Sequence, residues 1–137
     1  MQRALILPMV VYVFYIWILA AINFRTRLGA LKSGKVSKKY FQNFLGEMSS
    51  ERVHIVGRHF DNQFQAPVIF LIGLCAHLAL GKADDFTIVL AWSFIATRAV
   101  HSLIHLGKNQ LRKRVLAYAA GWFVLCALWG QLLLLVL

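Results

Sequence analysis

The sequence predicts an all-α integral membrane protein, a bundle of four helices that each cross the bilayer. The chain of 137 residues is 60% hydrophobic, and its apolar residues gather in long runs instead of alternating with polar ones. A helix that crosses roughly 30 Å of hydrocarbon needs about 20 mostly apolar residues, because backbone groups in lipid must bond within their own segment. Residues 10–21 and 117–137 are apolar almost all round, which is typical of a helix that faces lipid.

The runs that are long enough to span the membrane cover about residues 4–24, 64–80, 86–106 and 115–137. The first run is longer than the core of a secretory signal, which is usually about 7–15 residues, so we expect it to remain as a membrane helix. No internal repeat, low-complexity tract or Pro/Gly-rich linker divides the chain. We therefore expect residues 1–137 to form a single membrane domain.

The segment before the second span carries two further signals. Apolar side chains recur at spacings of one, three and four, the pattern of an amphipathic segment at the membrane surface, in Tyr40, Phe41, Phe44, Leu45 and Met48. Ser49 and Ser50 are both plausible N-caps. We expect a helix to begin there and to run straight into the second span through Val53, Val56 and Phe60.

The net charge of +10 is explained by membrane topology. Basic residues fill the first and third loops, which predicts that both loops are cytoplasmic and that both termini lie on the other side. These residues are Arg25, Arg27, Lys32, Lys35, Lys38, Lys39, Arg52 and Arg58 in the first loop, and Lys108, Arg112, Lys113 and Arg114 in the third. Because the cations flank apolar helices beside lipid headgroups, the charge does not indicate a nucleic-acid partner.

Polar residues inside the spans are the candidate functional residues, because each is costly in lipid without a partner, water or ligand. Arg98 is the deepest, roughly 13 Å from the cytoplasmic end of its span at 1.5 Å per residue, which is too deep to snorkel comfortably. Helical spacing groups these residues into three stripes toward the same membrane face. The stripes are Arg98, His101 and His105; Arg58, Asp61, Asn62 and Gln65; and Arg114 with Tyr118.

Two interpretations of the stripes remain open. In one, Arg98 pairs with Asp61 or bonds Asn62, the histidines bond carbonyls, and the cluster only holds the bundle together. In the other, the surplus of Arg58, Arg98 and Arg114 over Asp61 forms a pocket for a small anion. Such a pocket would be entered from the cytoplasm, and a hydrophobic cosubstrate would arrive from the bilayer.

A metal site is a third interpretation. His101 and His105 are four residues apart, the spacing at which two imidazoles of one helix bind one ion, and Asp61 or His59 would be the third ligand. The charge of Arg98, one turn away, opposes a cation. We therefore expect no metal.

The sequence resembles the MAPEG family, the membrane-associated proteins in eicosanoid and glutathione metabolism. The resemblance rests on the spacing of the spans, the run Arg58-His-Phe-Asp-Asn62-Gln-Phe-Gln65-Ala-Pro67 and Arg98-Ala-Val-His101, and it covers nearly the whole chain. Within the family, the chain most resembles a bacterial branch in which an Asn-Gln-Phe-Glu stretch is followed closely by Pro-Val.

The resemblance implies a homotrimer of four-helix subunits in a bacterial inner membrane. Glutathione would bind between neighbouring subunits near the cytoplasmic surface, as the thiol cosubstrate of a transferase or peroxidase that acts on lipophilic electrophiles. A cationic pocket would favour its reactive thiolate.

Residue roles carry over by position within this resemblance. Asn62 would hold the peptide, and Arg98 with His101 would form the deep wall. Arg25 or Arg27 would reach a carboxylate from the end of the first span. The sulfur would be stabilised by Arg114 with Tyr118, or by Arg112 if the loop is shifted.

The chain departs from the family pattern at three positions of the expected pocket. The family's glutamate after the Asn is Gln65, the basic residue that often precedes the Asn is Asp61, and the tyrosine one turn past the His is His105. Asp61 would replace the missing carboxylate from one position over. The alternative function is a non-catalytic membrane protein that binds a lipid or another small anion, or stabilises a membrane complex.

Overall fold

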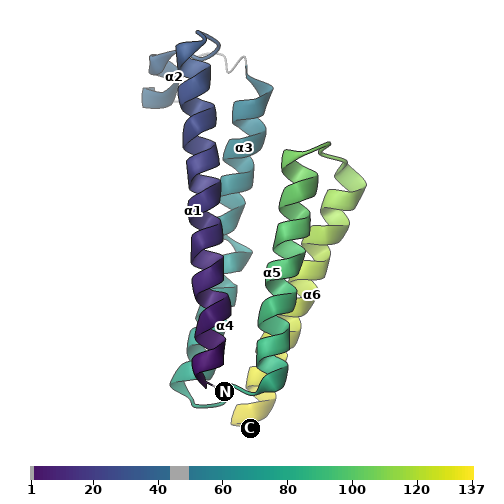
Figure 1. Ribbon diagram of the computed structural model, residues 1–137. Coiled ribbons are helices and arrows are strands. Elements are labelled where there is room, and N and C mark those ends of the chain that lie inside the picture. The colour runs from purple at the N-terminus through teal and green to yellow at the C-terminus, as the bar shows by residue number, and fades with distance from the viewer. Residues whose placement is uncertain (1, 44–49) are drawn as a thin grey trace.

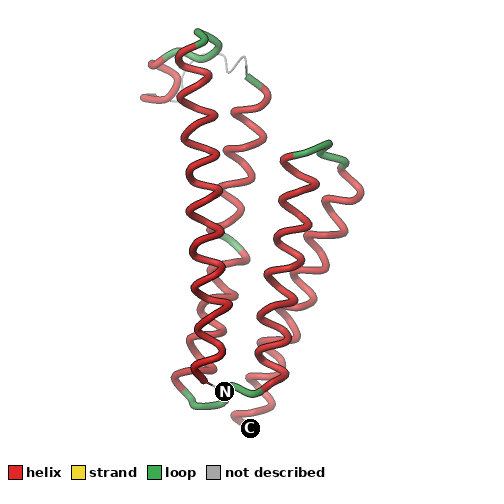
Figure 2. The backbone as a smooth tube through the Cα atoms, viewed as in Figure 1, coloured by secondary structure: helices red, strands yellow, loops and turns green. Residues whose placement is uncertain are grey.

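The computed structural model describes residues 2–43 and 50–137, and over these ranges every regular element is helical (Figures 1 and 2). The elements are α1 (Gln2–Lys32), α2 (Lys38–Asn43), α3 (Glu51–Asp61), the 3₁₀ turn η1 (Asn62–Phe64), α4 (Ala66–Ala79), α5 (Asp85–Leu106) and α6 (Leu111–Val136). Four helices are long and apolar enough to cross a membrane: Arg3–Lys32, Glu51–Ala79, Asp85–Leu106 and Leu111–Val136. The prediction of an all-α protein with four spans is confirmed.

Helix α1 is longer than its apolar run. It continues past Phe24 to Lys32, so Arg25, Arg27 and Lys32 lie on a helix and not in a loop, contrary to the sequence prediction. The helix ends at Lys32, and Gly34 follows with a φ of +68°, which allows the N–H of Lys35 to bond the carbonyl of Ala30 at 3.0 Å. Basic residues do not end a helix, whereas a left-handed glycine does.

The second span is interrupted, and the expectation of one straight helix is wrong. Ser50 is the N-cap of α3, as expected, but α3 gives way to η1 and α4 begins only at Ala66 (Figure 2). Pro67 explains the break, because it has no N–H to donate to the carbonyl four residues earlier and its ring clashes there. As a result, the side chain of Gln63 is buried, at 1% exposure.

The two halves of the bundle meet in an aromatic core. Helix α1 packs against α3 and α4, and α5 and α6 form a hairpin (Figure 1). Phe70 of α4 stacks on Phe94 of α5 with ring centroids 4.2 Å apart, and Tyr12 of α1 contacts both rings. This apolar core lies in the half of the bundle that carries both termini, which leaves the opposite half to polar side chains.

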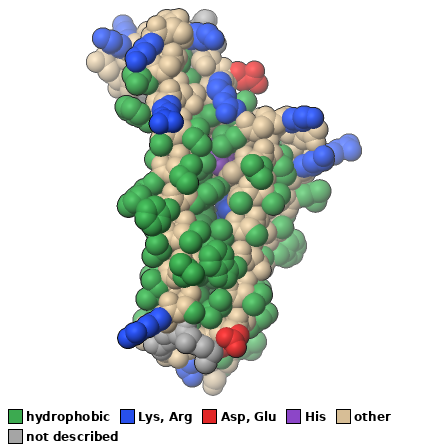
Figure 3. All heavy atoms as spheres, viewed as in Figure 1, with side chains coloured by type: hydrophobic (Ala, Val, Ile, Leu, Met, Phe, Trp, Pro, Cys, Tyr) green, Lys and Arg blue, Asp and Glu red, His purple; other side chains and the backbone are tan. Residues whose placement is uncertain are grey.

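The outer surface suits lipid. Figure 3 shows apolar side chains over the middle of the visible face, whereas most of the visible Lys and Arg side chains lie at the end that carries α2 and the α5–α6 loop. We call this the basic end; its described residues are 25–43, 50–58 and 106–114. Tyr40 and Phe41 pack there against Ala30, Val36 and Val53. The other residues of the expected surface segment, Phe44, Leu45 and Met48, lie outside the described residues, as does the alternative N-cap Ser49.

Candidate functional site

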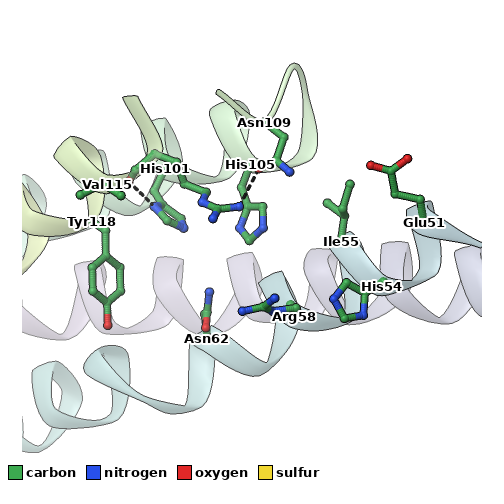
Figure 4. Close-up of a pocket in the computed structure, with 11 residues that line it drawn as sticks. Glu51, His54, Ile55, Arg58, Asn62, His101, His105, Asn109, Val115 and Tyr118 are labelled. Atoms are coloured by element: carbon green, nitrogen blue, oxygen red, sulfur yellow. Dashed lines mark hydrogen bonds between the residues drawn. The ribbon is translucent and has the colours of Figure 1, made fainter. Parts of the chain in front are cut away.

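A cavity of about 400 Å³ opens between α3 and the α5–α6 hairpin in the basic end. Figure 4 shows side chains from the two sides facing one another, with Asn62 and Arg58 opposite His101 and His105. We call it the main cavity; its lining residues are Glu51, His54, Ile55, Arg58, Asn62, His101, His105, Asn109, Arg114, Val115 and Tyr118.

Positive charge exceeds negative charge in the main cavity. Arg58 and Arg114 are its permanent cations, and Glu51 is its only carboxylate among the described residues. The α5–α6 loop positions Arg114, because Arg114 Nη1 donates to Asn109 Oδ1 at 2.7 Å. Asn109 itself has a φ of 50°, a left-handed conformation that asparagine tolerates better than most residues. A small anion is therefore the ligand that this cavity would favour.

Three buried histidines converge beside the main cavity, and two of them, His101 and His105, line it. His59 comes from α3, and His101 and His105 lie one turn apart on α5. His59 Nδ1 lies 3.1 Å from His105 Nδ1, and one ring nitrogen from each of the three lies within 4.8 Å of the others. His101 Nδ1 lies 3.3 Å from the carbonyl oxygen of Arg114, so α6 fixes that ring. These are the described residues that could hold a metal ion.

Arg98 lies behind the cavity and is only 2% exposed. Its Nη2 donates to Gln63 Oε1 at 3.5 Å, and its guanidinium carbon lies 6.0 Å from the centre of the Tyr118 ring. Within residues 2–43 and 50–137, no carboxylate pairs with it and its Nε has no hydrogen-bond partner. The expected partners, Asp61 and Asn62, are therefore wrong. The physical reason is the break at η1, which buries Gln63 and leaves Asp61 exposed.

The sequence-predicted residues divide among four places. Six of them line the main cavity: Arg58, Asn62, His101, His105, Arg114 and Tyr118. Arg98 lies behind it. Arg27 and Asp61 line a neighbouring cavity of about 210 Å³, which Arg58 also lines. Arg25 and Gln65 are exposed and line neither cavity in this chain.

The sequence patterns did not predict Glu51, His54 and Asn109 in the main cavity, or Gln63 as the partner of Arg98. Glu51 and His54 lie seven and four residues before Arg58, so the stripe on α3 extends toward its N-terminus. That spacing could have identified them. No periodic signal identifies Gln63, because its position depends on the interrupted helix.

Together, the four helices and the cavity define the class as an integral membrane protein with a cationic cavity near one end of its bundle. The chain belongs to the MAPEG family, whose family model matches residues 5–134 of its 137 residues. No curated protein and no solved structure matches the chain.

Proposed function

We propose that this protein is a glutathione-dependent membrane transferase or peroxidase that acts on lipophilic electrophiles and binds the thiol in the main cavity. The observation that carries the proposal is the cavity of about 400 Å³ in which Arg58 and Arg114 outnumber Glu51. Its size is within the usual range for small-molecule sites, about 300–1,000 Å³. Glutathione is a net anion, and the MAPEG family contains glutathione-related transferases as well as other membrane proteins.

The lining residues match the groups of glutathione. Arg58 and Arg114 are suited to its carboxylates, and the Asn62 side chain can bond the peptide. Glu51 is suited to the ammonium, because it is the carboxylate of this cavity, whereas Gln65 and Asp61 lie outside it. The pairing of Asp61 with the ammonium, expected from the sequence, is replaced in this proposal by Glu51.

Catalysis would consist of thiolate stabilisation and positioning. The cations of the cavity lower the pKa of a bound thiol, and Tyr118 with Arg114 would stabilise the sulfur. The thiolate then forms a carbon–sulfur bond to the electrophile as the leaving group departs, and the thiol proton passes to water. Val115 lines the cavity and is 54% exposed, and a lipophilic cosubstrate would enter from the bilayer beside it.

The proposal includes a homotrimer in a bacterial inner membrane with the basic end in the cytoplasm. Arg25 is exposed on α1, so its side chain is available for a contact with a neighbouring subunit. Arg27 is held within its own chain, with its guanidinium carbon 5.7 Å from the centre of the Phe41 ring. Of these two arginines, Arg25 is therefore the better candidate for a ligand contact across subunits.

The second candidate is a non-catalytic membrane protein that binds a lipid or another small anion, or stabilises a complex. It is favoured by His105, which lines the cavity where the family pattern has a tyrosine. Conjugation of glutathione to a generic aromatic electrophile by the purified protein separates the two candidates. Saturable turnover that is lost in Arg114→Gln but retained in Arg112→Gln supports the transferase; glutathione binding without turnover supports the second candidate.

A further inference from the structure

The histidine cluster has a property that anion binding does not use. His59, His101 and His105 are all buried, and they are the three described residues whose ring nitrogens come within 4.8 Å of one another. Two of them also line the main cavity. Three imidazoles on adjacent helices with access to a cavity are the ligand set of an open, catalytic type of zinc site.

The contacts of His59 are compatible with a free lone pair on Nδ1. Ser102 Oγ donates to the carbonyl oxygen of Arg98 at 3.0 Å and can accept a hydrogen bond from His59 Nε2, 2.8 Å away. The hydroxyl of Tyr15 also contacts Ser102 Oγ, and Gln63 Nε2 lies 3.4 Å from His59 Nε2. In the tautomer that carries its hydrogen on Nε2, the lone pair of His59 Nδ1 faces His105 Nδ1 at 3.1 Å. Two ligands of a tetrahedral ion at about 2.0–2.1 Å are about 3.3 Å apart, close to this separation.

The third ring is arranged in the same way. His101 Nδ1 must donate to the carbonyl oxygen of Arg114, 3.3 Å away, because a carbonyl only accepts. Its Nε2 then carries a lone pair, and this atom is buried without a hydrogen-bond partner among the described residues. Metal-binding histidines usually donate their second N–H to a carbonyl, carboxylate or water in this manner, which orients the ring.

We propose that His59 Nδ1, His101 Nε2 and His105 Nδ1 bind a divalent transition-metal ion such as Zn²⁺, with a fourth position open to the main cavity. This site goes beyond the proposed function and does not depend on it, since all three ligands belong to the chain. The charge of Arg98 opposes a cation, but its guanidinium bonds Gln63 and lies 6.0 Å from the Tyr118 ring centre. An anionic fourth ligand, such as hydroxide or a thiolate, offsets that charge.

The test is metal binding to the purified protein in detergent, without a polyhistidine tag and after removal of metals with a chelator. Zn²⁺ is titrated by calorimetry, and Co²⁺ by the visible absorption that a tetrahedral complex gives. We expect one ion per chain. Each of His59→Gln, His101→Gln and His105→Gln removes a ligand and should weaken metal binding by about 100-fold or more. Loss of a residue that only hydrogen-bonds a ligand typically weakens binding by about 10-fold to 100-fold.

Two controls make the result specific. His54→Gln removes a histidine of the same cavity that is outside the cluster and should leave the affinity unchanged. Ser102→Ala leaves all three ligands in place but removes the acceptor of His59 Nε2, and should weaken binding by about tenfold. Circular dichroism identifies any histidine variant that does not fold. If one does not fold, the metal affinity of Ser102→Ala relative to wild type decides the test.

Absence of saturable binding overturns the proposal, as does binding that His54→Gln weakens as much as the cluster variants do. Glutathione binding measured in the presence of the chelator is a separate readout, so failure of the metal site and failure of the thiol site are distinguishable.

Discussion

The guanidinium of Arg98 donates to the side-chain oxygen of Gln63, with 3.5 Å between Nη2 and Oε1. The same oxygen accepts from the hydroxyl of Tyr12 at 2.8 Å. Gln63 therefore joins α1, the interrupted second span and α5 at the boundary between the aromatic core and the main cavity. A neutral amide, and no carboxylate, is the partner of the deepest cation among the described residues.

Replacement of Gln63 by Leu should destabilise the protein by about 2 kcal/mol, because Tyr12 and Arg98 each lose a buried acceptor. Thermal unfolding in detergent measures the change. Asp61→Asn is the control and should have almost no effect, since Asp61 is exposed. A larger loss in Asp61→Asn than in Gln63→Leu would mean that Arg98 pairs with Asp61 after all.

Glu51→Gln tests the contact proposed for the ammonium of glutathione. Because Glu51 is exposed at the rim, we expect a modest loss of affinity for glutathione, about threefold to fivefold, as for an exposed ion pair. A glutathione analogue without the ammonium should bind wild type and variant equally well. Equal losses of affinity for both ligands would show that Glu51 does not contact the ammonium.

Tyr118→Phe separates binding from catalysis. Tyr118 lines the main cavity, and removal of its hydroxyl should lower the conjugation rate at saturating glutathione by about 100-fold, as for loss of one donor to a developing anion. Calorimetric affinity for glutathione should change little. An unaltered rate would exclude Tyr118 from sulfur stabilisation.

The cap of α5 predicts a pH dependence of stability. The hydroxyl and the N–H of Thr87 donate to Asp84 Oδ1, each at 2.7 Å, and Gln131 of α6 donates to the same atom, which together lower the pKa of Asp84 below its ordinary value. A lowered folded-state pKa stabilises the fold above the unfolded-state pKa, and the effect is lost as the pH falls through the folded-state value.

Asp84→Ala should therefore cost about 1 kcal/mol at neutral pH, and less in acid. Thermal unfolding of wild type and variant at several pH values measures the difference. A difference that is the same at every pH would show that the charge of Asp84 contributes nothing to the cap.

The spans were predictable because lipid imposes a minimum length of apolar helix, and that length can be read from sequence. The end of α1 was not predictable, because Arg25 and Arg27 mark the membrane boundary and not the end of the helix. The end follows instead from the left-handed Gly34. Hydropathy therefore located the membrane segments but not the ends of the helices.

The site was predictable in part for a related reason. Stripes of polar residues on single helices identified Arg58, Asn62, His101 and Arg114, since helical spacing alone sets which side chains share a face. The partners across helices did not follow from spacing. The bond between Gln63 and Arg98 and the approach of His59 to His105 depend on how the interrupted span packs against α5.

The role of the main cavity as the thiol site is tested by glutathione binding to the detergent-purified protein, measured by calorimetry at low salt, where charge interactions are least screened. We expect saturable binding that weakens by about tenfold or more in Arg58→Gln and in Arg114→Gln, as for loss of a charged hydrogen bond. Arg112→Gln, an exposed arginine outside the main cavity, should bind like wild type. No saturable binding, or equal affinity in all four proteins, would contradict the claim that the main cavity is the thiol site.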